Sequence, residues 1–219
     1  MIITIDGLSA TGKTTVARLV AQKLGWHYFD TGAMYRAVTY ALLQQKISLG
    51  ESEKLKELLD NFKFEVRSED SKVRYFVDSE EVTKLIRTPE VNKKVSEVSA
   101  EPAVRELLVA LQRDFGKSKK AVFEGRDMGT TVFPEAEVKV FLTARSTVRA
   151  ERRYKELKDS FPDASEKEVL DNLLHRDDFD ASRKTSPLKQ ADDAHLIDTS
   201  DVTLDEVVEH ILSLVSRKG

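Results

Sequence analysis

Residues 7–14 read GLSATGKT, which places Gly7 first, then four residues, then Gly12, Lys13 and Thr14. The preceding residues, 2–5, are a short run rich in β-branched side chains that predicts a strand. Residues 13–24 carry apolar side chains at helical spacing and are followed by a glycine, so we predict a helix that ends there. A glycine loop between a strand and a helix turns backbone N–H groups and the positive helix end toward an anion. The pattern therefore predicts a phosphate-binding P-loop.

The loop assigns separate tasks to its side chains. Lys13 can reach the β and γ phosphates of a nucleoside triphosphate, and the Thr14 hydroxyl can hold Mg²⁺. The alternative is a glycine turn that only caps a helix, but pattern and context agree on the P-loop. We expect ATP phosphates to be bound by Gly7, Ser9, Ala10, Thr11, Gly12, Lys13, Thr14 and Thr15.

Further short apolar runs are separated by segments too long for hairpins. Such spacing predicts parallel strands joined by helices, which is an α/β fold. The runs are residues 27–29, 121–124, 138–142 and 195–197. A capping box at Thr203 and Glu206 predicts the start of a last helix. Its expected buried stripe is Leu204, Val207, Val208, Ile211, Leu212 and Val215.

Two regions interrupt this rhythm and are interpreted as inserts. In residues 48–87, the segments 62–66 and 73–77 alternate in the manner of strands around the polar turn 69–72, which predicts a small antiparallel sheet. Residues 146–183 are almost wholly polar and charged. We expect both inserts to be grown out of one core.

The composition excludes several classes of protein. The 219 residues include 35 Lys and Arg against 38 Asp and Glu, which gives a formal charge of −3. The chain therefore lacks the overall excess of basic residues that is typical of proteins binding duplex DNA or anionic membranes. The chain has no cysteine, which excludes disulfides and thiolate metal sites. The longest apolar run, residues 107–111, is far shorter than a membrane span. We expect a cytoplasmic monomer without nucleic-acid or membrane partners.

Two glycine-containing segments follow predicted strands at the edge where a parallel sheet presents loops to a ligand. Residues 30–36 read DTGAMYR, and Arg36 could reach a second phosphate. Residues 124–129 read EGRDMG and place Arg126 and Asp127 at the same edge. Either segment alone is typical of an ordinary glycine turn, whereas two of them opposite a P-loop favour a binding site.

The second insert holds arginines at helical spacing. Arg149, Arg152 and Arg153 share one predicted face, and Arg176, Asp180 and Arg183 share another. Because these arginines have no apolar stripe to anchor them, we expect a moving lid that is ordered by polyphosphate, with Arg152 contacting the donor nucleotide. A solvated helix with surface ion pairs is the alternative.

Other chemistries find no support in the sequence. Residues 92–95 read NKKV and lack the final aspartate of the guanine-reading motif of GTPases. The four histidines do not have metal-ligand spacing, and no GxSxG elbow is present.

Together these motifs resemble the bacterial cytidylate kinase family of nucleoside monophosphate kinases, over nearly the whole chain. The resemblance rests on the P-loop and on residues 30–36, 86–88, 96–105, 125–129 and 176–183. It implies a three-layer P-loop core with a five-stranded parallel sheet, a monophosphate-binding domain with an antiparallel insert, and a short lid. The expected boundaries are 1–35, 106–145 and 184–219 for the core, 36–105 for the monophosphate-binding domain and 146–183 for the lid. Thr31 and Leu8 stand where the family often has serine and proline, and neither change puts the activity in doubt.

The resemblance also implies residue roles. Thr31, Arg36 and Arg126 would engage the acceptor phosphate, and Ser96, Arg105 and Asp127 would contact the cytosine edge. Asp180 and Arg183 resemble ribose contacts, and Arg176 resembles a lid residue that bridges donor and acceptor phosphates.

The implied reaction is phosphoryl transfer from ATP to CMP or dCMP with Mg²⁺, in which Lys13, Arg126 and Arg176 neutralise charge. Three alternatives remain at this point. A kinase for another acceptor, such as shikimate or UMP, would share the P-loop but not the cytosine set. A regulatory module would bind ATP without turnover, and a nucleic-acid-binding protein would have to use the arginine cluster.

Overall fold

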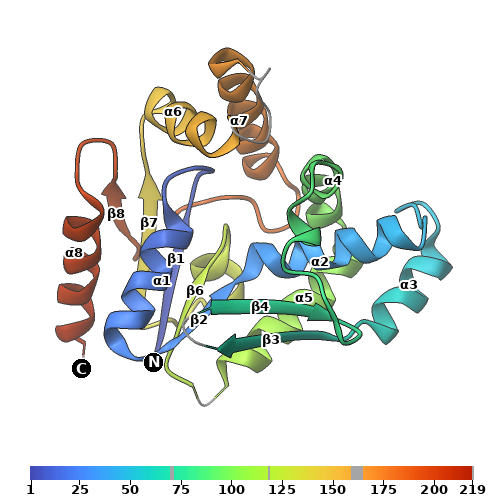
Figure 1. Cartoon of the computed structure of the whole chain (residues 1–219). Coiled ribbons are helices and arrows are strands. Elements are labelled where there is room, and N and C mark those ends of the chain that lie inside the picture. Colours follow the sequence, from blue (N-terminus) through green and yellow to red (C-terminus); the bar gives the residue numbers. More distant parts are fainter. Residues whose placement is uncertain (70–71, 118, 159–164, 219) are drawn as a thin grey trace. The chain divides into compact units, whose positions relative to one another are not determined.

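The strand that precedes the P-loop lies at the centre of a five-stranded sheet. The computed structural model describes residues 1–69, 72–117, 119–158 and 165–218, and its main sheet has the order β2-β6-β1-β7-β8. Every neighbouring pair in this sheet is parallel. The strands are β1 Ile2–Gly7, β2 His27–Asp30, β6 Ala121–Glu124, β7 Val138–Thr143 and β8 His195–Asp198. Their carboxyl ends therefore share one edge, where the P-loop leaves β1 (Figure 1), and the predicted α/β fold is confirmed.

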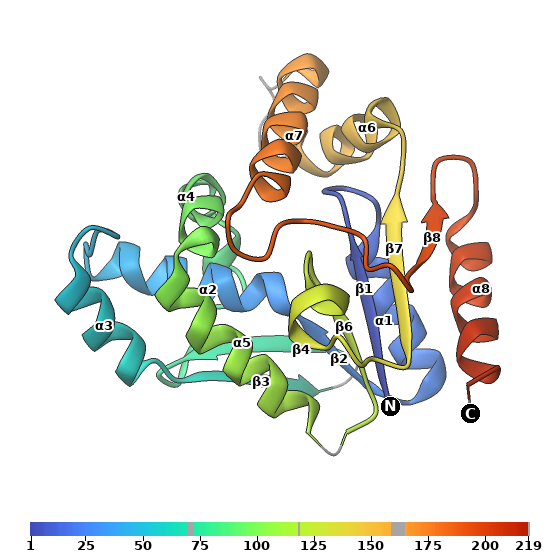
Figure 2. The same cartoon turned by 180° about the vertical axis from the view of Figure 1, so that it is seen from behind.

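One face of this sheet packs on two helices. Ile3 and Ile5 of β1 are fully buried against α1 (Lys13–Leu24) and α8 (Leu204–Ser216). Figures 1 and 2 show these two helices side by side. The capping box of α8 is confirmed, but the expected stripe was wrong at Leu204, which is 40% exposed because it stands in the first turn of the helix. Leu214 is buried in this core instead.

Aromatic rings cover the opposite face. Phe29 and Phe123, paired residues of β2 and β6, stack with ring centroids 4.7 Å apart. Phe115 stacks on Phe29, and the ring of Phe133 lies tilted against Phe123. Side chains alternate across a strand, so Thr4 and Asp6 of β1 belong to this second face. Polar residues of β1 thus point away from the face that α1 and α8 cover.

Glycines shape the P-loop where no other residue fits. A Cβ on Gly7 would lie 2.1 Å from the Leu142 carbonyl oxygen of β7, so the backbones approach too closely for any side chain. Gly12 has a φ of 90° immediately before α1, in the left-handed region that glycine tolerates. The loop is therefore fixed by its backbone at both ends.

The second insert forms two helices that follow β7. They are α6 (Ser146–Leu157) and α7 (Glu166–Ala181), and residues 159–164 of the expected lid lie outside the described residues. The expectation that this insert has no apolar anchor was wrong. Ala150 of α6 packs with Val169 and Leu173 of α7 in a small buried cluster.

The chain divides into two compact units, Met1–Asp30 with Phe115–Gly219, and Thr31–Asp114. The second unit contains α2 Thr31–Gln44, α3 Ser52–Asn61, β3 Phe64–Glu69, β4 Lys72–Val77, β5 Glu80–Glu81, η1 Leu85–Arg87, α4 Pro89–Ala100 and most of α5 Pro102–Gly116. Strands β3, β4 and β5 form an antiparallel sheet, as predicted for the first insert, whereas α3 was not predicted. Residues 70–71 of the expected turn lie outside the described residues. The sequence-based domain boundaries stay a prediction.

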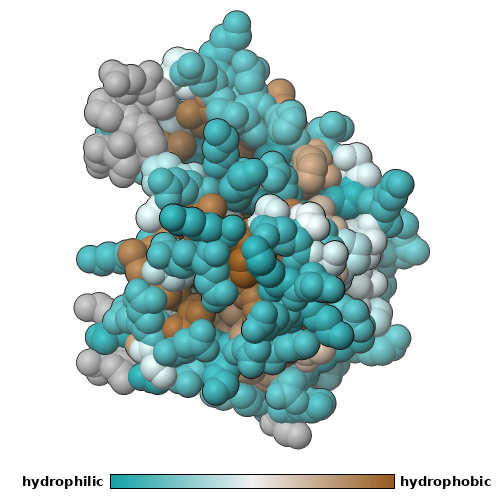
Figure 3. Space-filling view, turned by 90° about the vertical axis from the view of Figure 1, so that its right-hand side faces the viewer, coloured by the Kyte–Doolittle hydropathy of each residue, from teal (hydrophilic) through white to brown (hydrophobic). Residues whose placement is uncertain are grey.

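Polar side chains prevail on one face of the molecule. Figure 3 shows one face of the molecule that is mostly hydrophilic, in keeping with a charged fraction of 33%. Within the described ranges, every helix is too short or too polar to cross a membrane.

Candidate active site

Lys13 is the central cation of the P-loop. It stands in the first turn of α1, only 6% of the residue is exposed, and its Nζ lies 2.5 Å from the Leu8 carbonyl oxygen. Burial, together with the positive charges of Arg126 and Arg176, lowers the pKa of Lys13 to about 7, and the Glu124 carboxylate opposes this shift. Three cations held this close together favour a bound polyanion, because a phosphate would relieve their mutual repulsion.

Glu124 ends β6 beside the same lysine. Burial, together with the nearby Asp30 carboxylate, raises the pKa of Glu124 to about 7. Lys13 and hydrogen bonds from Thr14 and Tyr28 oppose it, and the Tyr28 hydroxyl lies 2.8 Å from Oε1. The hydroxyl predicted to hold Mg²⁺ therefore lies among carboxylate oxygens, which are the ligands that this ion prefers.

Arg126 links the P-loop to the end of α7. Its guanidinium donates to the Ser9 hydroxyl at 2.9 Å and to Oδ2 of Asp180 at 3.1 Å. Arg183 donates to the other oxygen of Asp180, whose side chain is only 2% exposed. Arg183 was predicted on the same helical face as Asp180, but α7 ends at Ala181, so Arg183 reaches Asp180 from the segment beyond the helix.

Arg149 does not share a phosphate-facing surface with its neighbours. It is buried, it pairs with Asp177 of α7, and it donates to the carbonyl oxygens of Ser9 at 3.2 Å and Ala144 at 3.1 Å. Asp177 in turn accepts the Ser9 backbone N–H at 3.1 Å. One buried ion pair therefore binds both backbone groups of a P-loop residue.

Arg152, the predicted donor contact, lies at the segment after β8. Its guanidinium donates to the carbonyl oxygen of Thr199 at 2.6 Å and to its hydroxyl at 3.1 Å. The same hydroxyl lies 3.1 Å from the carbonyl oxygen of Thr11 in the P-loop. Arg152 was expected to contact the donor nucleotide. Its guanidinium instead binds Thr199, and Thr199 in turn binds the P-loop.

Four further predicted residues, Thr31, Arg36, Ser96 and Arg105, belong to the second unit. Thr31 is buried at the start of α2, and Arg36, also in α2, donates to Oδ1 of Asn92 at 2.5 Å. Ser99 connects Ser96 with Arg105, because its hydroxyl donates to the Ser96 carbonyl at 2.9 Å and its own carbonyl accepts from Arg105 at 3.2 Å. The structure therefore brings two members of the proposed cytosine set to one place in this unit.

Sequence reasoning missed two buried acids of the site, Asp6 and Asp177, and the role of Arg149. Asp6 accepts the backbone N–H groups of Met128 and Gly129, and Arg149 with Asp177 holds Ser9. In the sequence, these two acids are marked only by their neighbours. Asp6 directly precedes the P-loop, and Asp177 directly follows the proposed lid arginine Arg176.

A P-loop with a buried lysine at the carboxyl edge of a parallel sheet defines a P-loop protein that binds a nucleoside triphosphate. The model of the cytidylate kinase family matches residues 3–217, and the chain belongs to that family. The cytidylate kinase of Protochlamydia amoebophila is 51% identical over 97% of this chain and 95% of its own length, and that of Ligilactobacillus salivarius is 48% identical over 99% and 97%. The fold is shared with a shikimate kinase structure from Bacteroides thetaiotaomicron. The TM-score is 0.51, and the sequences are 14% identical over 99% of this chain and 98% of the shikimate kinase chain.

Proposed function

We propose that the protein transfers the γ-phosphate of ATP to CMP or dCMP, giving ADP and CDP or dCDP. The observation that carries this proposal is the buried Lys13 of the P-loop, with Arg126 and Arg176 close enough to lower its pKa. Such a cation cluster suits the charge that spreads over a phosphoryl group in transfer. Membership of the cytidylate kinase family is the basis for proposing CMP or dCMP as the acceptor.

The chemistry needs no general base. The phosphate dianion of a nucleoside monophosphate is already a nucleophile, so catalysis rests on alignment and on neutralising charge. Lys13 would hold the β and γ phosphates, Arg126 the acceptor phosphate, and Arg176 both phosphates from α7. Closure of the lid would exclude the water that otherwise would hydrolyse ATP.

The residues near Thr14 fit a Mg²⁺ ion. The Thr14 hydroxyl contacts the Glu124 carboxylate, and Asp30 lies close to it, which gives an all-oxygen donor set. Bound with ATP, the ion would neutralise charge on the β and γ phosphates. Thr14 would be its protein ligand, since its hydroxyl follows the P-loop lysine directly in the first turn of α1.

The roles proposed for the acceptor-binding residues follow from the family resemblance. Arg36 and Thr31 would hold its phosphate, Ser96, Arg105 and Asp127 its base, and Asp180 and Arg183 its ribose. The contacts of Ser99 support the base assignment, because they keep Ser96 and Arg105 together before substrate binds. We propose further that the enzyme works as a cytoplasmic monomer with only small-molecule partners.

The test is ADP formation with ATP, Mg²⁺ and each of the nucleoside monophosphates in turn. CMP and dCMP should give the highest kcat/KM, with UMP at least about 10²-fold lower, since a polar site rejects an analogue that leaves its groups unpaired. An equal rate with UMP would refute the acceptor assignment. Binding of ATP without turnover on any monophosphate would refute the function.

A further inference from the structure

Asp6 is a buried carboxylate whose two oxygens both accept backbone N–H groups. It is the residue of β1 immediately before Gly7, and it is 4% exposed. Oδ1 accepts from Met128 at 2.9 Å and Oδ2 from Gly129 at 2.8 Å. Two charge-assisted bonds from one side chain to successive backbone groups fix both the position and the orientation of that backbone.

The bonded backbone continues the segment that carries Arg126 and Asp127. Upstream, the N–H of Gly125 donates to the Ile5 carbonyl at 3.1 Å, so β1 also holds that end. Residues 126 and 127 therefore lie between two anchor points, both of them on β1. The turn of η2 (Met128–Val132) then closes on the carbonyl of residue 127, which accepts two further N–H groups.

The loop lies tightly against β1 at the second anchor. A Cβ added to Gly129 would lie 3.1 Å from Thr4 Oγ1, 3.3 Å from Lys139 Cδ and 3.4 Å from Asp6 Oδ2. Contacts of 3.1 Å are shorter than carbon–oxygen van der Waals distance, so even a methyl group would displace one of the partners. Glycine at this position is what lets the backbone reach the carboxylate.

We propose that Asp6 is a positioning residue that aligns Arg126 and Asp127 with the P-loop. The inference rests on the proposed function, in which these two residues engage the acceptor. The same strand end carries the P-loop, because Gly7 follows Asp6 directly. A shift of the 126–127 segment would therefore misalign the acceptor while the donor loop kept its own backbone contacts.

The first test is Asp6→Asn, which keeps the shape of the side chain. An amide can accept one N–H with its oxygen, but it opposes the second N–H with its own NH₂ group. We expect kcat/KM for CMP to fall about 10²-fold, with both a lower kcat and a higher KM for CMP, because displacements near 1 Å cost that much. The Kd for ATP, measured without acceptor, should change by less than about threefold.

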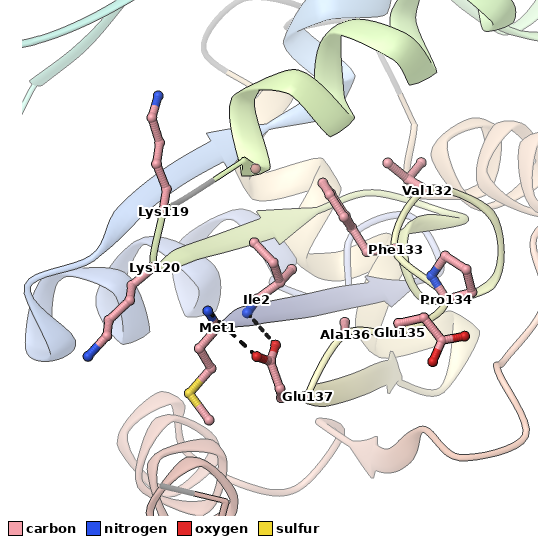
Figure 4. A pocket seen from close by; sticks show the side chains of 11 residues that line it. Met1, Ile2, Lys119, Lys120, Val132, Phe133, Pro134, Glu135, Ala136 and Glu137 are labelled. Atoms are coloured by element: carbon pink, nitrogen blue, oxygen red, sulfur yellow. Dashed lines mark hydrogen bonds and ion pairs between the residues drawn. The ribbon is translucent and has the colours of Figure 1, made fainter.

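Glu137→Gln is the matched control. Oε2 of Glu137 accepts the Ile2 N–H at 2.6 Å, so it is also a carboxylate that holds backbone, at the opposite end of β1 (Figure 4). Its variant should keep the parental kcat, KM for CMP and Kd for ATP, with at most a lower melting temperature. Equal kinetic losses in the two variants would overturn the proposal, since they would reflect loosening of β1 as a whole.

A second pair of variants keeps the test valid if Asp6→Asn does not fold. Gly129→Ala should show the same loss on CMP with ATP binding retained, and Thr4→Ala combined with Gly129→Ala should recover part of it, because the closest contact has been removed. Parental CMP kinetics in a folded Asp6→Asn or in Gly129→Ala, or an equal loss of ATP affinity, would overturn the inference. If the parent itself does not phosphorylate CMP, the proposed function fails instead, which the parental assay shows separately.

Discussion

The ion pair between Arg149 and Asp177 can be tested by removing its cation. Its side chains are only 5% and 10% exposed, so neither charge has much water around it. Arg149→Met deletes the charge and leaves the carbonyls of Ser9 and Ala144 without this donor. The Asp177 carboxylate keeps the Ser9 N–H but loses its counter-ion.

The expected loss of stability follows from this geometry. Breaking a buried pair by removing one partner costs about 3–5 kcal/mol, because an uncompensated charge stays buried. Asp177→Asn combined with Arg149→Met removes that charge and keeps an acceptor for the Ser9 N–H. We expect this double variant to recover about 2 kcal/mol relative to Arg149→Met. Its Kd for ATP should still exceed the parental value, since Ser9 has lost a donor.

The assay is urea unfolding of the parent, both single variants and the double variant, with the coupling energy taken from the cycle. Arg153→Met is the control on the same helix, because Arg153 pairs with Glu156 at 2.8 Å but with 33% and 60% of the side chains exposed. That pair should contribute at most about 0.5 kcal/mol. A coupling energy below about 0.5 kcal/mol for Arg149 and Asp177, or equal effects in Arg149→Met and Arg153→Met, would refute the reasoning.

Three further predictions concern the P-loop, the cytosine set and Asp6. Lys13→Ala should keep the parental melting temperature to within a few degrees but lower kcat by about 10²-fold or more, since it removes charge stabilisation in the transition state. A near-parental kcat in a steady-state assay would contradict this prediction. Asp127→Ala should reduce the preference for CMP over UMP by about 10-fold or more. Equal losses of kcat/KM on both substrates would show that Asp127 does not distinguish the two bases. Burial raises the pKa of Asp6 from 3.8 to about 6, so its proton is bound more tightly in the folded state. The stabilisation is complete below the unfolded value of the pKa and is lost as the pH rises through about 6. The parent should therefore lose about 2 kcal/mol of stability relative to Asp6→Asn between pH 4 and 6, and a pH-independent difference in urea unfolding would contradict this.

The fold could be predicted because its signals are local. The P-loop pattern, the apolar runs and the capping box of α8 each lie within a few residues, and strand pairing then follows from chain connectivity. The error at Leu204 has a local cause too. Helical periodicity identifies a face of the helix, but it does not say where along the helix the covering sheet ends.

The contacts of the site could not be predicted in the same way. Asp6 meets its partners 122 and 123 residues further along the chain, and Asp177 meets Ser9 across 168 residues. Charge spacing alone suggested that Arg149, Arg152 and Arg153 share one surface. Their partners differ because α6 packs on α7 and on the segment after β8, so that one arginine is buried, one binds Thr199 and one remains a surface ion pair.

The buried acids of the first unit act as structural acceptors more than as bases. A carboxyl with a raised pKa near a P-loop invites assignment as a general base. Asp6, however, directs each oxygen to a backbone N–H, and Asp177 is neutralised by Arg149 while it holds Ser9. Phosphoryl transfer between two phosphates has no proton to remove from the nucleophile, so its rate depends on how well donor and acceptor loops are held. Carboxylates accept hydrogen bonds from backbone N–H groups more strongly than neutral oxygens do. This difference explains why Asp6 and Asp177 are charged side chains at positions where the reaction requires rigid loops.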